Sequence, residues 1–179
     1  MGPLHHRRQF QALDVAGGDA RMSTGFLLNA FAKVDLFDQC PEAVKRARHA
    51  MQRHKSFGYV SQATMQSFEW RFRYSGIFMV WCSGYLVRPE LVRFLQRAKA
   101  QLIEPEKRMS RSSLPESFIY VLDNVLCPGE VSLMHKGQQV RAEAELEEIF
   151  REAGLMVFSR SKRQPMPAKF RDVVVWALY

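Results

Sequence analysis

Short apolar runs alternate with amphipathic segments along this 179-residue chain, and this feature constrains its fold most strongly. A buried strand appears as a short continuous apolar run, whereas a helix repeats apolar residues every three or four positions. The alternation predicts an α/β fold, a three-layer sandwich around a mostly parallel sheet. Strand-like runs occur at 12–15, 33–40, 59–68, 75–84, 118–124, 156–162 and 171–179, and helical patterns at 41–55, 88–102 and 142–155.

The two ends of the pattern need separate interpretation. After the first strand we expect a helix whose apolar positions include Phe26, Leu27, Ala30 and Phe31. At the other end, only the segment 163–170 joins the last two strand-like runs, and this is too short for a crossover helix. The final two strands are therefore predicted to form an antiparallel hairpin at one edge of the sheet.

Length and composition favour one globular domain over residues 1–179, because 47% of the residues are hydrophobic and 25% are charged. No apolar run approaches the roughly 20 residues that span a bilayer. The basic start lacks the apolar region of a secretory signal, so we expect a cytoplasmic protein, with a nuclear or organellar location left open. The three cysteines favour free thiols, and no spacing indicates a metal site.

A net charge of +8 favours acidic partners, among which nucleic acid is one class. The basic segment 45–55 and the Arg-aromatic segment 70–74 are candidate contacts for RNA. An ordinary solvated basic surface explains the same residues. The polar segment 104–117 is expected to be an exposed basic loop.

Ligands of open α/β sheets bind beyond the carboxyl ends of the central strands. A small-residue turn at 16–20 follows the first predicted strand, which carries Asp14, and Asp38 ends the second. An acid after the second strand is suited to a ribose, because its oxygens accept hydrogen bonds from both hydroxyls. The strand ends therefore predict one crevice for a nucleotide-like ligand, to which Gln66, Trp81, Asp123 and Asn124 contribute.

The order of the motifs "LDVAGGDAR", "VDLFD", "MQSF", "VWCSGYL", "LDN", "FREAGL" and "VVWALY" resembles the alpha-N-terminal protein methyltransferase family. This family is a branch of the class I S-adenosylmethionine-dependent methyltransferases, and the resemblance covers nearly the whole chain. It implies a Rossmann-like, seven-stranded type of sheet. It also implies the cofactor S-adenosylmethionine (AdoMet) and methyl transfer to the terminal α-amine of a protein, which typically begins with a small residue followed by Pro and a basic residue.

The resemblance also assigns roles by position. Arg21 faces the methionine carboxylate of the cofactor, and Asn124 holds the amine with support from Asp123. Trp81 shapes the channel in which the first substrate residue enters. The implied cofactor-binding residues are Gly17, Gly18, Arg21, Asp38, Met65, Gln66 and Trp81, and the implied catalytic residues are Asn124, Asp123 and Trp81.

Several positions depart from the family pattern. Ala16 and Ala20 stand where the family keeps glycines, at a cost of roughly 1–2 kcal/mol each if the position needs a positive φ. Lys136 falls where the family has a carboxylate that accepts the amine proton, and His135 is the only local substitute. The chain also begins about a dozen residues before its first strand, whereas the family carries a helical N-terminal extension.

Two functions from different classes follow. The first is an N-terminal protein methyltransferase, with activity weakened or lost if Lys136 has no substitute. The alternative is a catalytically silent methyltransferase-fold scaffold that binds RNA or an acidic protein partner. The sequence predicts no oligomeric state.

Overall fold

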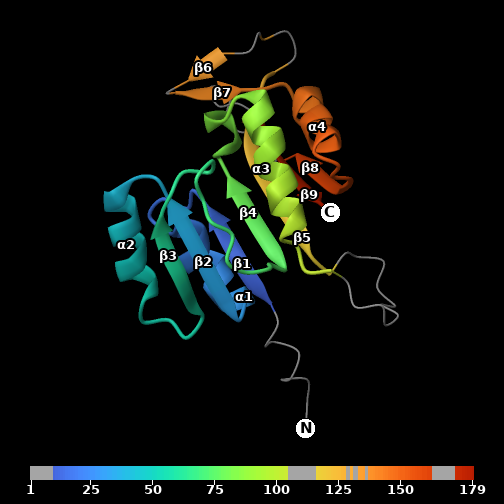
Figure 1. Cartoon of the computed structure of the whole chain (residues 1–179). Helices are drawn as coiled ribbons and strands as arrows, with labels where there is room; N and C mark the ends of the chain where they lie inside the picture. Colours follow the sequence, from blue (N-terminus) through green and yellow to red (C-terminus); the bar gives the residue numbers. More distant parts are fainter. Residues whose placement is uncertain (1–9, 105–115, 128–129, 131–132, 136, 163–171) are drawn as a thin grey trace. The chain divides into compact units, whose positions relative to one another are not determined.

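A computed structural model describes residues 10–104, 116–127, 130, 133–135, 137–162 and 172–179. Seven strands form one sheet in the order β3-β2-β1-β4-β5-β9-β8, and β6 pairs with β7 separately (Figure 1). The strands are β1 Gln11–Val15, β2 Lys33–Asp38, β3 Phe57–Gln62, β4 Gly76–Val80, β5 Phe118–Val125, β6 Leu133–His135, β7 Gln138–Val140, β8 Val157–Lys162 and β9 Asp172–Leu178. The helical elements are η2 Ser23–Leu27, α1 Leu28–Ala30, α2 Pro41–Met51, η3 Ser83–Tyr85, α3 Arg88–Ala100 and α4 Glu143–Glu152.

The chain divides into two compact units, and the division falls within β4. Unit 1 comprises Met1–Phe78 and Gln101–Ser117, and unit 2 comprises Met79–Ala100 and Phe118–Tyr179. The strand order reverses beside β1, because β2 and β4 lie on opposite sides of it. Such a reversal is where open α/β sheets bind their ligands.

In unit 1, strand β2 pairs in parallel with both β1 and β3. Their side chains are almost completely buried along β1 and β2, as expected for strands covered on both faces. Helix α2 has Pro41 and Glu42 in its first turn and Arg48 and His49 in its last turn, a distribution that the helix dipole favours. Sequence and helix electrostatics therefore agree in this region.

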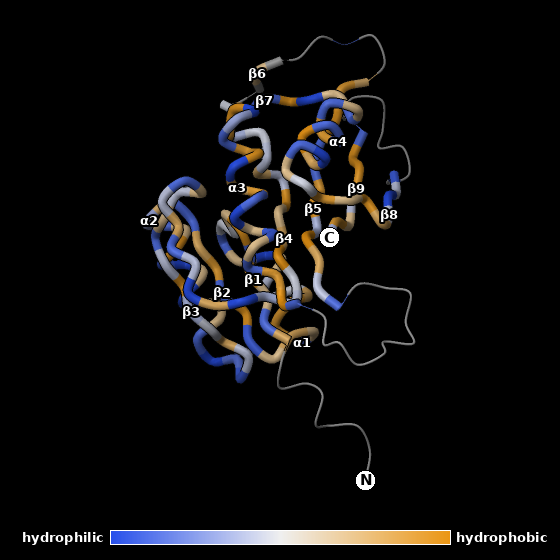
Figure 2. Tube along the Cα trace, turned by 45° about the vertical axis from the view of Figure 1, so that its right-hand side comes forward, coloured by the Kyte–Doolittle hydropathy of each residue, from blue (hydrophilic) through white to orange (hydrophobic). Residues whose placement is uncertain are grey.

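In unit 2, β9 pairs antiparallel with both β5 and β8, so the predicted C-terminal hairpin is confirmed. Trp176 of β9 packs edge-on against Phe150 of α4 and is fully buried. Helix α3 alternates between hydrophobic and hydrophilic residues along its turns (Figure 2), which is the amphipathic pattern read from the sequence. Strand β8 is the edge strand, and its Arg160 and Lys162 form ion pairs with Glu143 at 2.8 and 3.1 Å.

The helix after β1 differs from the prediction. It contains a π-helical turn, η2, before the short α1, and this widened turn changes which residues face inward. Leu27 is buried as predicted, but Phe26 and Ala30 are exposed and Phe31 is half-buried. The buried polar residue Ser23 donates a hydrogen bond to Asp14, and this contact explains the altered phase.

The third strand is shorter than the predicted run 59–68, because β3 ends at Gln62. A turn follows, in which Thr64 and Ser67 exchange side-chain hydrogen bonds with each other's backbone N–H groups at 3.1 Å. Such side-chain contacts compete with strand pairing. Met65 and Gln66 therefore lie in a turn rather than in a strand.

The hairpin of β6 and β7 has no counterpart in the predicted elements. Gly137 lies between the two strands with a φ of 77°, which is a glycine-favoring turn conformation. Of the predicted exposed loop 104–117, residues 105–115 lie outside the described part of the chain. Glu104 and Glu116 are exposed, whereas Ser117 at the end of the loop is buried. No helix among the described residues is long and apolar enough to cross a membrane.

Candidate functional site

The turn after β1 has three residues in the left-handed region. Ala16, Gly18 and Ala20 have φ values of 49°, 55° and 62°. This conformation costs an L-residue roughly 1–2 kcal/mol, and only glycine adopts it freely. The structure thus retains a glycine-type turn although two of its positions are alanines. Because the free protein already holds this strain, the cost falls on folding stability rather than on ligand binding.

The two glycines of this turn have different surroundings. A Cβ atom on Gly17 would lie 2.6 Å from Leu36 Cδ1 and 2.8 Å from Asp14 Cγ, so this position is closed. A Cβ atom on Gly18 would meet no atom within 4 Å. Gly18 is therefore the point of the turn at which a ligand can approach the backbone.

Asp38 is tied directly to this turn. Its Oδ2 accepts a hydrogen bond from the Gly18 N–H at 3.0 Å, and its Oδ1 accepts one from the Cys40 N–H at 2.8 Å. Each carboxylate oxygen has two lone pairs, so both oxygens can still accept a hydroxyl. The predicted pair of Gly18 and Asp38 is thus brought together in unit 1.

Asp14 of β1 is buried beneath the turn, with 1% of its surface exposed. Its Oδ2 accepts a hydrogen bond from Ser23 Oγ at 2.6 Å. Burial raises the pKa of Asp14 to about 6, against the opposing effect of the Ser23 hydrogen bonds, and the charge of Asp38 raises it further. This carboxyl group therefore titrates close to neutral pH.

The remaining predicted cofactor residues of unit 1 differ in how far they are exposed. Arg21 is exposed one residue after Ala20, and Gln66 is exposed in the turn that follows β3. The Met65 side chain is buried. Asp19, the extra acid of the turn, forms an ion pair with Arg46 of α2 at 2.8 Å. A neighbouring cation thus compensates the added negative charge.

In unit 2, Trp81 follows β4 directly and is held in an unusual conformation. Its φ is 53°, which is costly for a bulky residue, and 46% of its surface is exposed. Its N–H donates to Leu122 O at 2.8 Å, and its carbonyl accepts from Gln138 Nε2 at 3.0 Å. Neighbouring strands thus hold both polar backbone groups of an exposed indole.

Asp123 and Asn124 are neighbours in β5 with different environments. The Asp123 carboxylate is buried and accepts hydrogen bonds from Ser83 Oγ at 2.6 Å, Ser83 N at 3.2 Å and Asn124 N at 2.8 Å. Burial raises the pKa of Asp123, opposed by these hydrogen bonds and by the charge of Arg141. Successive side chains of a strand point to opposite faces, so Asn124 points away from this carboxylate. Asp123 therefore supports the Asn124 backbone.

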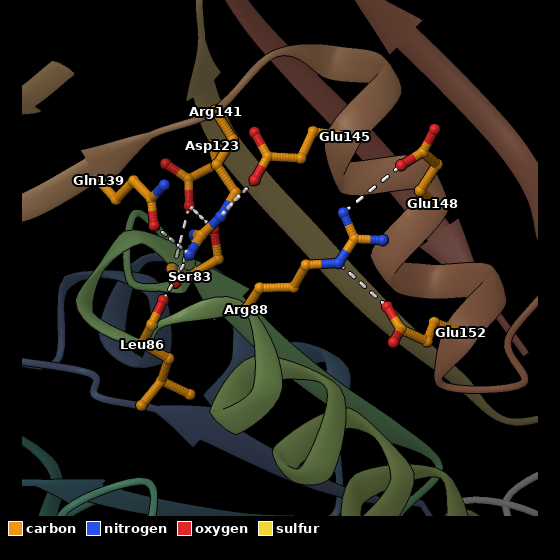
Figure 3. A network of polar contacts seen from close by, with 9 residues as sticks. All are labelled: Ser83, Leu86, Arg88, Asp123, Gln139, Arg141, Glu145, Glu148 and Glu152. Atoms are coloured by element: carbon orange, nitrogen blue, oxygen red, sulfur yellow. Dashed lines mark hydrogen bonds and ion pairs between the residues drawn. The ribbon is translucent and has the colours of Figure 1, made fainter. Parts of the chain in front are cut away.

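Sequence reasoning missed Arg141, the only Lys or Arg among the described residues that is buried. It lies in the polar network of Figure 3 together with Asp123 and Ser83. No motif marks it, because a single arginine before a helix usually lies in solvent. Only the fold reveals its burial. The predicted base His135 has its side chain outside the described part of the chain, as has the whole of Lys136.

Three arginines of the two candidate RNA-binding segments have contacts within unit 1. Arg48 donates to Val60 O, Arg71 lies over the Tyr59 ring at 4.7 Å, and Arg73 donates to Leu102 O. The described residues include 17 Lys and Arg and 17 Asp and Glu, whereas the rest of the chain has 9 and 1. The net charge of +8 thus belongs to the remaining segments, and no observation favours an RNA surface on the described part.

The sequence pattern of the AdoMet-dependent proline di-methyltransferases matches residues 3–179. The chain is similar to an alpha N-terminal protein methyltransferase 1 of Oryza sativa subsp. indica, with 25% identity over 96% of this chain and 55% of the relative. It is also similar to an N-terminal Xaa-Pro-Lys N-methyltransferase 1-B of Xenopus laevis, with 27% identity over 93% of this chain and 71% of the relative. This chain thus spans little more than half the length of the rice relative.

Solved structures show the same fold. An S-adenosylmethionine-dependent methyltransferase of Leishmania major has a TM-score of 0.82 at 20% identity and covers 98% of this chain and 67% of its own. A glycopeptide N-methyltransferase complexed with S-adenosylmethionine has a TM-score of 0.72 at 12% identity and covers 98% and 83%. The predicted Rossmann-like methyltransferase fold is confirmed. Because the family pattern extends over nearly the whole chain, this protein belongs to the family of AdoMet-dependent proline di-methyltransferases.

Proposed function

We propose that the protein transfers the methyl group of AdoMet to the terminal α-amine of a protein substrate. The observation that carries this proposal is the turn after β1, which keeps three left-handed residues and an open approach at Gly18. A chain that had lost the cofactor would not need to retain the strain of Ala16 and Ala20. The names of the relatives support a protein N-terminus as the substrate.

The residues of unit 1 fit AdoMet. Gly18 allows the backbone to approach the methionine end, and Arg21 offers a planar fork to its carboxylate. Asp38 has free lone pairs for the two ribose hydroxyls, and Met65 and Gln66 would border the adenine. AdoMet supplies an electrophilic methyl group bound to a sulfonium.

The residues of unit 2 fit a terminal amine. The carboxamide oxygen of Asn124 can accept a hydrogen bond from the amine, and this orients its lone pair. Asp123 accepts a hydrogen bond from the backbone N–H of Asn124 and so supports this residue. The exposed indole of Trp81 offers a flat apolar wall for the first substrate residues.

The reacting amine must be neutral, because its lone pair attacks the methyl group. A free α-amino group has a pKa of about 7.7–8.0, so only part of it is neutral at pH 7. At the position where the family pattern has a carboxylate to accept this proton, this chain has Lys136. We therefore expect kcat/KM to rise with pH until the substrate amine is deprotonated, near pH 8.

Two measurements test the proposal on the same protein. In a thermal shift assay, AdoMet at 100 times its Kd should add about 2.7 kcal/mol of stability. Mass spectrometry should then detect added methyl groups on a peptide that begins Xaa-Pro-Lys. Absence of any shift at millimolar AdoMet refutes the proposal, and a shift without methyl transfer indicates the silent scaffold instead.

We also propose that the partner of this protein is its protein substrate and that it is located in the cytoplasm. The substrate contributes a free N-terminus, and free thiols at Cys40, Cys82 and Cys127 support the expected cytoplasmic location. Imaging of the tagged protein in cells tests the location.

A further inference from the structure

The guanidinium of Arg141 binds the segment that follows Trp81. Its Nη1 donates to Ser83 O at 3.2 Å, and its Nη2 donates to Leu86 O at 2.6 Å (Figure 3). Nη2 also donates to Gln139 Oε1 at 2.7 Å. Arg141 thus hydrogen-bonds to both ends of the η3 turn. Only 1% of the Arg141 surface is exposed.

The same turn is held on its N–H side by Asp123. The carboxylate accepts both the backbone N–H and the hydroxyl of Ser83. Ser83 thus receives a hydrogen bond from Arg141 at its carbonyl and donates two to Asp123. A buried cation and a buried anion fix one residue two positions after Trp81.

The hairpin approaches η3 so closely that only glycine fits between them. A Cβ atom on Gly84 would lie 2.7 Å from Gln139 O and 3.1 Å from Gln138 Cβ. From the same hairpin, Gln138 donates to the carbonyl of Trp81. The backbone of β7 is therefore docked on the segment from Trp81 to Leu86.

Folding stability alone does not account for this buried polar network. Replacing buried ion pairs by apolar residues of similar volume is often neutral or stabilising. A left-handed tryptophan is also strained, and such strain persists only where neighbouring contacts over-determine the backbone. The contacts described above provide that over-determination.

We propose that Arg141 is a positioning residue, which holds the Trp81–Leu86 segment so that the Trp81 indole is presented in a fixed orientation. Its role in catalysis rests on the proposed function, because the indole is the wall for the first substrate residues. Its role in holding the Trp81–Leu86 segment does not depend on whether the protein is an active enzyme.

The indole N–H resonances of the 15N-labelled protein test the assignment directly. The chain has three tryptophans, Trp70, Trp81 and Trp176, and a Trp81→Phe variant identifies the relevant peak. Arg141→Lys keeps the charge but loses the planar fork, and Arg141→Met keeps the volume but loses both. In either variant that folds, we expect the Trp81 peak to shift or broaden while the Trp70 peak stays in place.

Arg88→Lys is the matched control. Arg88 also binds glutamates of α4, at 3.1 Å from Glu152 and 3.4 Å from Glu148, but it lies on the surface (Figure 3). This variant should leave the Trp81 peak unchanged. An unmoved Trp81 peak in a folded Arg141 variant would overturn the assignment.

Kinetics separate positioning from a merely structural role. In Arg141→Lys, we expect kcat/KM for the peptide to fall at least tenfold through KM, with the Kd for AdoMet within twofold of the parent. A lower melting temperature with unchanged peptide kinetics would contradict the proposal. If the Trp81 peak moves but the parent protein methylates no peptide, the assignment of Arg141 stands and the proposed function fails.

Discussion

Asp14 in unit 1 and Asp123 in unit 2 are both buried aspartates, and the two are compensated very differently. Asp14 in unit 1 accepts hydrogen bonds from Ser23, and the charge that acts on it is that of another acid, Asp38. Asp123 in unit 2 accepts three hydrogen bonds and lies in the field of Arg141. An uncompensated buried charge makes stability depend on pH, whereas a compensated one makes it depend on every partner of the network. The two units should therefore lose stability in different ways.

The largest effect is expected in unit 2. Asp123→Ala removes the acceptor of the Ser83 and Asn124 donors and leaves the charge of Arg141 to Glu145 alone. Breaking a buried ionic network in this way costs about 3–5 kcal/mol. Urea denaturation at pH 8 measures the loss. A loss below 1 kcal/mol would mean that the network contributes little.

Asp14→Asn in unit 1 should have the opposite sign. Because burial raises the pKa of Asp14 from 3.8 to about 6, the folded chain binds the proton more tightly than the unfolded chain. Stability linked to this group is full below pH 3.8 and is lost as the pH rises through 6. The asparagine variant should thus be more stable than the parent by about 3 kcal/mol at pH 8. Denaturation at pH 8 and pH 4 checks this, since the gain should shrink to about 0.5 kcal/mol at pH 4.

Substitutions at the two glycines of the turn should separate an effect on folding stability from an effect on AdoMet binding. Gly17→Ala forces a methyl group against Leu36 and Asp14 and should cost about 1–3 kcal/mol of folding stability. Gly18→Ala has space for its methyl group and should cost only about 1 kcal/mol through its positive φ. Because that methyl group enters the approach to the backbone, Gly18→Ala should lose AdoMet binding. Calorimetric titration of both variants tests the contrast, and tight AdoMet binding by Gly18→Ala would argue against this site.

The smallest effects concern the two alanines. Ala16→Gly relieves the left-handed strain at a half-buried position and should add about 0.5–1 kcal/mol to the free energy of unfolding. Ala20→Gly relieves similar strain but removes a fully buried methyl group, worth about 0.8 kcal/mol, so little net change is expected. Thermal denaturation of the pair provides the comparison. Equal gains in both variants would show that the Ala20 methyl group contributes no packing.

Much of the fold was predictable, because strand and helix periodicities and the short final connection each have a local cause. The turn at 16–20 and its link to Asp38 were also readable, since small residues and an acid occur at fixed distances from strand ends. The sequence alone left open whether Ala16 and Ala20 need a positive φ. In the structure both residues adopt one. Periodic signals thus identified most of the strands and helices and the turn after the first strand.

Features set by distant partners were not predictable. Ser23 faces inward because Asp14 of another element accepts its hydrogen bond, and the inserted π turn leaves Phe26 in solvent. Arg141 is buried because the carbonyls of Ser83 and Leu86, more than fifty residues away, replace its water. No local pattern encodes such partners. The roles of the individual site residues stay predictions for the experiments above.

The edge strand β8 has a consequence for the protein in a crowded solution. An outer strand exposes unpaired N–H and C=O groups, to which a second molecule can add a strand and start an aggregate. Arg160 and Lys162 place two cations on this edge, and their ion pairs with Glu143 fix them there. An incoming copy of the same strand would bring two like charges against them. Charged side chains on an outer strand are one of the features by which proteins discourage pairing with a second copy.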